Sequence, residues 1–147
     1  MLFTPGRIGS LMLPNRLLRS ATAERMADPD GTPLPALKAL YKKLARGGVG
    51  LIISGHMYIA EGGKCHPEMT GIHRDSLIPG LAELVSAVHQ EGGRIAAQLN
   101  HGGGNCSPEA VAQASAPSSG SRDFYKQSPR EINPERIPRL ITAFQDA

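Results

Sequence analysis

The chain has 147 residues, a formal net charge of +3 and only 4% aromatic residues. Its 40% hydrophobic and 20% charged residues are the balance of a folded globular protein, which excludes disorder as its general state. Basic residues are scattered and aromatic residues are few, so we expect no nucleic-acid partner. No apolar run approaches the roughly 20 residues that cross a bilayer, and the N-terminus has no signal-peptide pattern. We therefore expect a cytoplasmic protein with no membrane partner.

Two cysteines, Cys65 and Cys106, are well separated in the sequence and form no CxxC pattern. The sequence therefore predicts neither a zinc site nor a redox dithiol motif, and no bound metal. We expect free thiols in a reducing compartment, with a disulfide between the two cysteines as the alternative.

The N-terminal third of the chain predicts a hairpin, a strand and a helix. Apolar stretches flank Gly9-Ser10, which indicates a hairpin over residues 1–15, and a first strand is expected at 16–21. After a loop rich in Asp, Pro and Gly, a helix begins near Pro35 and ends at Gly47-Gly48. Its apolar residues fall on one helical face: Leu37, Leu40, Tyr41 and Leu44.

A second strand is expected at 49–54, where apolar residues run without alternation, as in a parallel strand buried on both faces. A loop follows from Gly55 to about Arg74, and Asp75 or Ser76 is the expected cap of the next helix. That helix ends at Gly92-Gly93. Its apolar face comprises Leu81, Leu84, Val85 and Val88.

A third strand is expected at 94–99, and a long loop from about His101 to Asn133 follows it. A last amphipathic helix starts near Pro138, in keeping with proline in a first helical turn. The order β-α-β-α-β-α predicts the α/β class with a parallel sheet and right-handed crossovers.

Small and polar side chains follow each expected strand, and parallel α/β folds bind ligands at these strand ends. The third strand ends in Gln98, whose amide offers both a donor and an acceptor to a flavin or a nucleobase. In the alternative, Gln98 caps backbone groups, and His56 and His101 are hydrogen-bonded loop residues. Glu24 and Arg25 could form a surface ion pair.

Several motifs along the whole chain resemble the Old Yellow Enzyme family when taken in order. These are Leu2-Phe3-Thr4-Pro5, Ile8-Gly9, Leu13-Pro14-Asn15-Arg16-Leu17, the block from Tyr41 to Ile53, Gly71-Ile72, Ile78-Pro79-Gly80, Val88-His89, Gly92-Gly93-Arg94-Ile95, the block from Gln98 to Gly103, and Ala116-Pro117-Ser118.

The resemblance implies a (β/α)8 TIM barrel with FMN bound noncovalently over the strand ends. It also implies an enzyme in which NADH or NADPH reduces the flavin, which then passes hydride to a small molecule such as an activated alkene or enone. Residues 1–15 would be the capping β-hairpin and residues 16–147 the first three βα units of one FMN-binding domain. Three units cannot close an eight-stranded barrel, so we expect an incomplete barrel.

The resemblance also assigns residues to the site. Gln98 corresponds to the glutamine that hydrogen-bonds the pyrimidine edge of the flavin, and His56 to a small residue beside the ring. Arg25 falls where some relatives place a substrate-contacting tyrosine. Alanine at position 23 departs from the Thr or Cys of many relatives. The residues that would line the isoalloxazine on the first strand are Ser20, Ala21, Thr22 and Ala23.

The family's substrate-anchoring pair, its proton donor and its phosphate-binding groups have no counterpart here, so no catalytic residue is assigned. We therefore expect the chain alone to be inactive and to need the remaining C-terminal part of the barrel, or a homo-oligomer, as partner. The alternatives are a small non-catalytic α/β protein that binds a ligand or partner, and a degenerate gene product.

Overall fold

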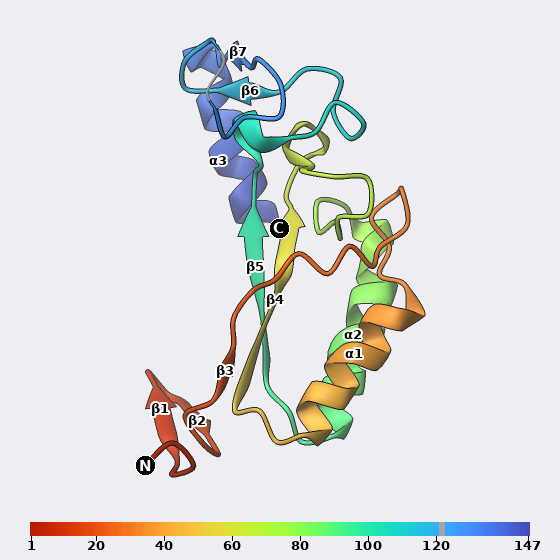
Figure 1. The fold of residues 1–147 in the computed structure, drawn as a ribbon, viewed down its shortest axis with the longest axis vertical. Helices are drawn as coiled ribbons and strands as arrows, with labels where there is room; N and C mark the ends of the chain where they lie inside the picture. Colours follow the sequence, from red (N-terminus) through yellow and green to blue (C-terminus); the bar gives the residue numbers. More distant parts are fainter. Residues whose placement is uncertain (121–122) are drawn as a thin grey trace.

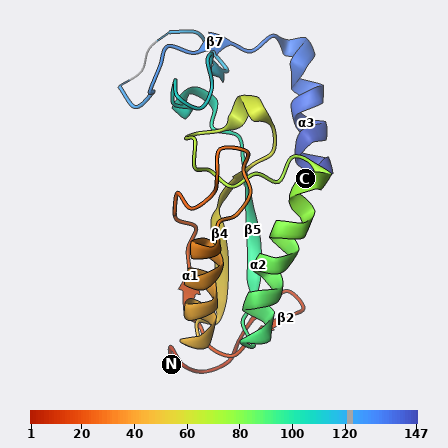
Figure 2. The same cartoon turned by 90° about the vertical axis from the view of Figure 1, so that its right-hand side faces the viewer.

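A three-stranded parallel sheet, in the order β3–β4–β5, organises the structure, a computed structural model that describes residues 1–120 and 123–147. The strands are β3 (Leu18–Arg19), β4 (Leu51–Tyr58) and β5 (Ile95–Asn100). Helix α1 (Pro35–Arg46) joins β3 to β4, and helix α2 (Ile78–Gln90) joins β4 to β5. Both helices cover the same face of the sheet (Figures 1 and 2). The predicted α/β class is confirmed.

Helices α1 and α2 bury apolar residues from the faces that their sequence periodicity predicts. Proline lies in the first turn of both helices, where its missing N–H costs no hydrogen bond. Gly48 and Gly92, just beyond the helix ends, have φ of 80° and 74°, a conformation that glycine adopts without steric cost. The predicted cap at Asp75 or Ser76 is wrong, because Asp75–Leu77 form a 3-10 turn and α2 begins after it without a side-chain cap.

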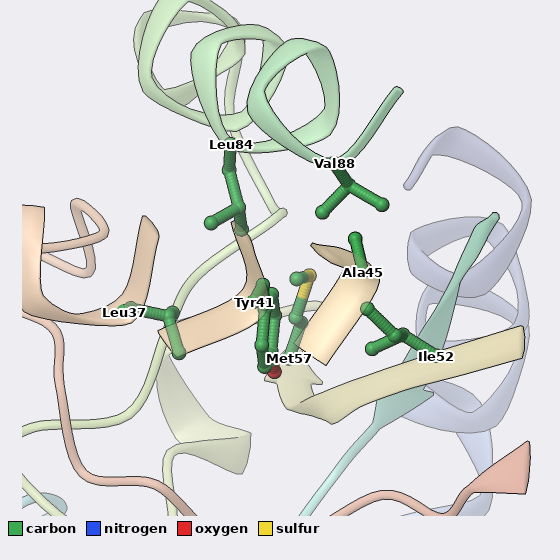
Figure 3. Packing of buried hydrophobic residues seen from close by; sticks show 7 residues of the cluster. All are labelled: Leu37, Tyr41, Ala45, Ile52, Met57, Leu84 and Val88. Carbon is green, nitrogen blue, oxygen red and sulfur yellow. The ribbon is translucent and has the colours of Figure 1, made fainter. Parts of the chain in front are cut away.

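The main core lies between α1, α2 and β4 (Figure 3). Burying a large apolar side chain completely stabilises the fold by roughly 1.5–3 kcal/mol, so these contacts dominate the attachment of the helices to the sheet. The buried members are Leu37, Tyr41, Ala45, Ile52, Met57, Leu84 and Val88.

Two strands differ in length from those predicted. β3 has only two residues because the backbone leaves the sheet after Arg19, whereas 16–21 was expected. β4 extends to Tyr58, past the predicted loop start at Gly55, because residues 56–58 continue to pair with β5. A register shift between Ile53 and His56 marks a bulge in β4.

The remaining elements lie at the two ends of the sheet. Strands β1 (Gly6–Ile8) and β2 (Leu11–Leu13) form an antiparallel hairpin at the end where β4 and β5 begin (Figure 1). Beyond the carboxyl ends, the segment predicted as a long loop contains two short paired strands, β6 (Ser115–Ala116) and β7 (Arg130–Glu131). Helix α3 (Ile137–Asp146) closes the described chain. None of the helices in the described ranges has the length and apolar character needed to span a membrane.

Candidate functional site

The carboxyl ends of β3, β4 and β5 meet at one edge of the sheet. β3 pairs in parallel with β4, and β4 in parallel with β5, so the segments that follow the strands emerge side by side. His56 and Gln98 are register partners, and residues 20–24 pass beside Gly55. The structure therefore brings the predicted site segments together. We call this edge the strand rim, formed by residues 20–24, 54–56 and 98–100.

Gly55 allows the segment after β3 to approach the bulge of β4. A Cβ atom at this position would lie 2.5 Å from the carbonyl oxygen of Thr22 and even closer to the carboxylate of Glu24. The bulge also frees the Gly55 amide from the sheet, and that amide donates a hydrogen bond to the Tyr41 hydroxyl at 2.8 Å. Helix α1 thus fixes the rim through one buried side chain.

Glu24 completes this attachment. Its side chain is almost fully buried and accepts a hydrogen bond from Arg19 at 3.3 Å. Burial raises the pKa of Tyr41 to about 12, and the negative charge of Glu24 adds to the rise. The structure therefore does not support the surface pairing of Glu24 with Arg25, because Glu24 turns inward to Arg19.

The face of the rim opposite the helices offers free hydrogen-bonding groups. Met57 packs in the helix core, and neighbouring strand residues point to opposite faces, so His56 lies on the other face. The exposed side chain of Gln98 forms no hydrogen bond within the described residues, and the same holds for the amide groups of residues 21–23. Free amides beside small side chains fit the edge of a planar ring that carries carbonyl and N–H groups.

His56 is held by neighbours rather than free to turn. Its Nδ1 lies 3.2 Å from Nδ2 of Asn100, which also donates to the sulfur of Cys65 at 3.6 Å. The ring centroid of His66 lies 5.6 Å from that of His56. His56 is therefore held between the tip of β5 and the loop after β4.

Arg25, the predicted substrate contact, lines a small cavity together with these histidines. Its φ of 53° is strained for a residue with a side chain, and its guanidinium lies 3.7 Å from Glu68. Both ring nitrogens of buried His66 lack a hydrogen-bond partner within the described part of the chain. Burial lowers the pKa of His66, and the positive charge of Arg25 lowers it further.

Sequence reasoning missed the groups that hold the rim in place. Arg19 and Glu24 are only five positions apart, but no periodic pattern pairs a strand residue with the loop after it. Tyr41 was expected only as part of an apolar helical face. Asn100 could have been found, because it continues the alternation of Gln98 at the tip of β5. Across residues 1–120 and 123–147, no group of three or more His, Cys, Asp or Glu residues could hold a metal.

A family model described as the NADH:flavin oxidoreductase / NADH oxidase family matches residues 1–147. The chain is 35% identical over 149 residues to an NADH oxidase of Thermoanaerobacter brockii, covering 99% of this chain and 23% of that protein. It is 31% identical over 147 residues to an NADPH dehydrogenase of Bacillus subtilis, covering 99% of this chain and 43% of the relative.

Solved structures give the same result. Morphinone reductase in complex with tetrahydroNAD superposes with a TM-score of 0.89 at 29% identity, over 99% of this chain and 44% of that one. The Old Yellow Enzyme homologue of Zymomonas mobilis gives a TM-score of 0.88 at 29% identity, over 99% of this chain and 43% of that one. The chain spans less than half the length of these relatives, so its fold corresponds to part of their barrels. The chain belongs to the NADH:flavin oxidoreductase / NADH oxidase family.

Proposed function

We propose that this chain supplies the first part of the flavin site of an FMN-dependent oxidoreductase, which transfers hydride from NADH or NADPH to an activated alkene or enone. The observation that carries the proposal is the strand rim. Three adjacent parallel strand ends place on one edge the Gln98 amide and the backbone amides of residues 21–23, all of which lack a hydrogen-bond partner among residues 1–120 and 123–147. Membership of the family supports the flavin and the nicotinamide nucleotide.

In this proposal each part of the rim has a separate task. FMN, when bound, supplies the hydride chemistry. Gln98 orients the pyrimidine edge of the ring, and Ala21 and Ala23 leave room for the ring to lie against the backbone. Because Ala23 has no side-chain donor, the backbone amides of residues 21–23 donate the hydrogen bonds to the ring instead. His56 is held by Asn100, so it lies beside the ring and leaves the Gln98 amide free to hydrogen-bond the ring.

We also propose that Arg25 contacts the substrate. Its side chain is 55% exposed, and it lies 3.7 Å from Glu68, longer than a normal hydrogen bond. The guanidinium is therefore able to donate to a carbonyl or carboxylate oxygen of a small molecule. Glu68 would keep it near the rim when no substrate is bound.

We also propose which partner the chain requires and where in the cell it works. The rim holds one side of a ring-binding site, so the activity requires the rest of a barrel, or a second copy, and the chain alone would be inactive. Use of a cellular nicotinamide nucleotide and the two free buried thiols support a cytoplasmic location.

The test compares Gln98→Ala with Gln90→Ala in the intact protein. Gln90 is also exposed, but it lies on α2, and its side chain hydrogen-bonds only to Ser86 within the described residues. Removing one hydrogen bond to the flavin should cost about 1 kcal/mol, or roughly a fivefold rise in the Kd for FMN, in Gln98→Ala alone. Unchanged FMN affinity in Gln98→Ala would contradict the assigned role, and failure of NADH and NADPH to reduce the bound flavin would contradict the proposed activity.

A further inference from the structure

The two cysteines, far apart in the sequence, lie against each other in the fold. A methyl group added to Gly102 would lie 2.5 Å from the sulfur of Cys65 and 2.8 Å from the sulfur of Cys106, so both sulfurs border the same small space. Cys106 is fully buried and Cys65 is 8% exposed. Both are free thiols. A pair of adjacent buried thiols is a different feature from a lone buried cysteine, because two sulfurs can form a bond.

The backbones that carry these thiols are also joined. Cys65 lies in the loop after β4, and Cys106 follows a short 3-10 turn after β5 (Gly103–Asn105). The amide of Ser107 donates to the carbonyl oxygen of Cys65 at 3.0 Å, and the amide of Gly102 donates to Gly63 at 2.8 Å. Two hydrogen bonds between the loops therefore hold the segments that carry the two cysteines next to each other.

The surroundings make the two thiols chemically unequal. A hydrogen bond from Cys106 lowers the pKa of Cys65 to about 4, and hydrogen bonds from His56 and Asn100 contribute to the same shift. The hydrogen bond to Cys65, together with burial, raises the pKa of Cys106. Of the two thiols, Cys65 therefore loses its proton more readily and is the nucleophile, and Cys106 is the partner that keeps its proton.

We propose that Cys65 and Cys106 are a peroxide-reactive dithiol that closes to a disulfide at the edge of the strand rim. The Cys65 thiolate attacks one oxygen of hydrogen peroxide, forming an S–O bond, breaking the O–O bond and releasing hydroxide. Cys106 then attacks the sulfenic sulfur of Cys65, so that the S–S bond forms and the oxygen leaves as water after taking up the thiol proton. The two sulfurs together lose two electrons, which peroxide accepts.

Oxidation would change the strand rim as well as the loops. The Cys65 sulfur accepts a hydrogen bond from Asn100, which lies 3.2 Å from His56, the register partner of Gln98. In a disulfide the Cys65 sulfur is a weaker acceptor for the hydrogen bond from Asn100. Asn100 and His56 then lose an anchor, and we expect weaker FMN binding by the oxidised protein. This second consequence rests on the proposed flavin site, whereas disulfide formation does not.

The experiment treats the fully reduced intact protein with one to five equivalents of hydrogen peroxide, followed by alkylation under denaturing conditions and peptide mass mapping. The expected result is simultaneous loss of both thiols, a peptide cross-linked between Cys65 and Cys106, and recovery with dithiothreitol. In Cys106→Ser, dimedone should trap a sulfenic acid on Cys65. In Cys65→Ser, Cys106 should stay unmodified over the same time.

Two outcomes would overturn the proposal. One is retention of both thiols in the folded wild-type protein under excess peroxide, and the other is a sulfenic acid on Cys65 that never proceeds to the cross-link. Flavin affinity is measured separately on the oxidised and reduced forms, with a roughly fivefold higher Kd expected after oxidation, as for one lost hydrogen bond. A cross-link with unchanged Kd would contradict only the coupling to the rim, and a cross-link in a protein without flavin affinity would contradict only the proposed function.

Discussion

Replacing Tyr41 by phenylalanine tests how helix α1 holds the strand rim. The Tyr41 side chain is fully buried, and its hydroxyl accepts a hydrogen bond from the Gly55 amide at 2.8 Å. Phenylalanine keeps the ring and leaves no large cavity, so the loss is that of the hydroxyl alone. An orphaned, partly buried amide costs about 1–3 kcal/mol of the free energy of unfolding. We also expect weaker FMN binding, because the bulge and the segment at Glu24 lose a shared contact.

Urea denaturation of the intact protein measures the stability loss. With a slope of about 2 kcal/mol per molar urea, the midpoint should fall by roughly 0.5–1.5 M. Tyr58→Phe is the matched control, because Tyr58 is equally buried but its hydroxyl donates to Asp30, at 3.2 Å, away from the rim. The control should lose stability and keep its FMN affinity. If Tyr41→Phe stays within about 0.5 kcal/mol of wild type, or if both variants lose FMN affinity equally, the reasoning fails.

Two further changes test other parts of the structure. Gly55→Ala places a Cβ against the carbonyl oxygen of Thr22, so it should cost about 1–3 kcal/mol of stability and weaken FMN binding. Gly62→Ala is the control, because no atom lies within 4 Å of its added Cβ, and it should change neither property. Equal melting temperatures for the two variants would contradict the close approach at Gly55. Because the pKa of folded His66 lies below the ordinary value of 6.5, the unfolded chain binds the proton first, so stability should decline as the pH falls from about 6.5 towards the folded pKa. His66→Asn should flatten that decline in urea titrations across this pH range, and an equally steep decline in the variant would show that other groups cause it.

The helices and the central strand could be predicted from the sequence because local patterns determine them. The apolar face of α1 and the continuous apolar run that begins β4 each follow from periodicity and burial. The end of β4 could not be predicted, because Gly55 and His56 have the composition of a loop. They stay in the sheet through long-range pairing with β5.

The sequence predicted where the candidate site lies but not which contacts hold it together. Parallel strand order alone brings Gln98 beside His56, so the sequence was sufficient for the location of the strand rim. The pairing of Arg19 with Glu24, and the contact of Cys65 with Cys106, depend on how loops fold over the strand ends. No spacing rule in the sequence gives such contacts, although loops that follow neighbouring strands must start at the same edge.

The most direct test of the strand rim as a flavin site is a crystal structure of the intact protein with FMN bound. Our account predicts that the isoalloxazine lies against residues 21–23 and that the Gln98 side-chain amide lies within about 2.7–3.2 Å of the ring's pyrimidine edge. A flavin bound elsewhere, for example in the groove lined by α2 and the end of α3, would contradict it.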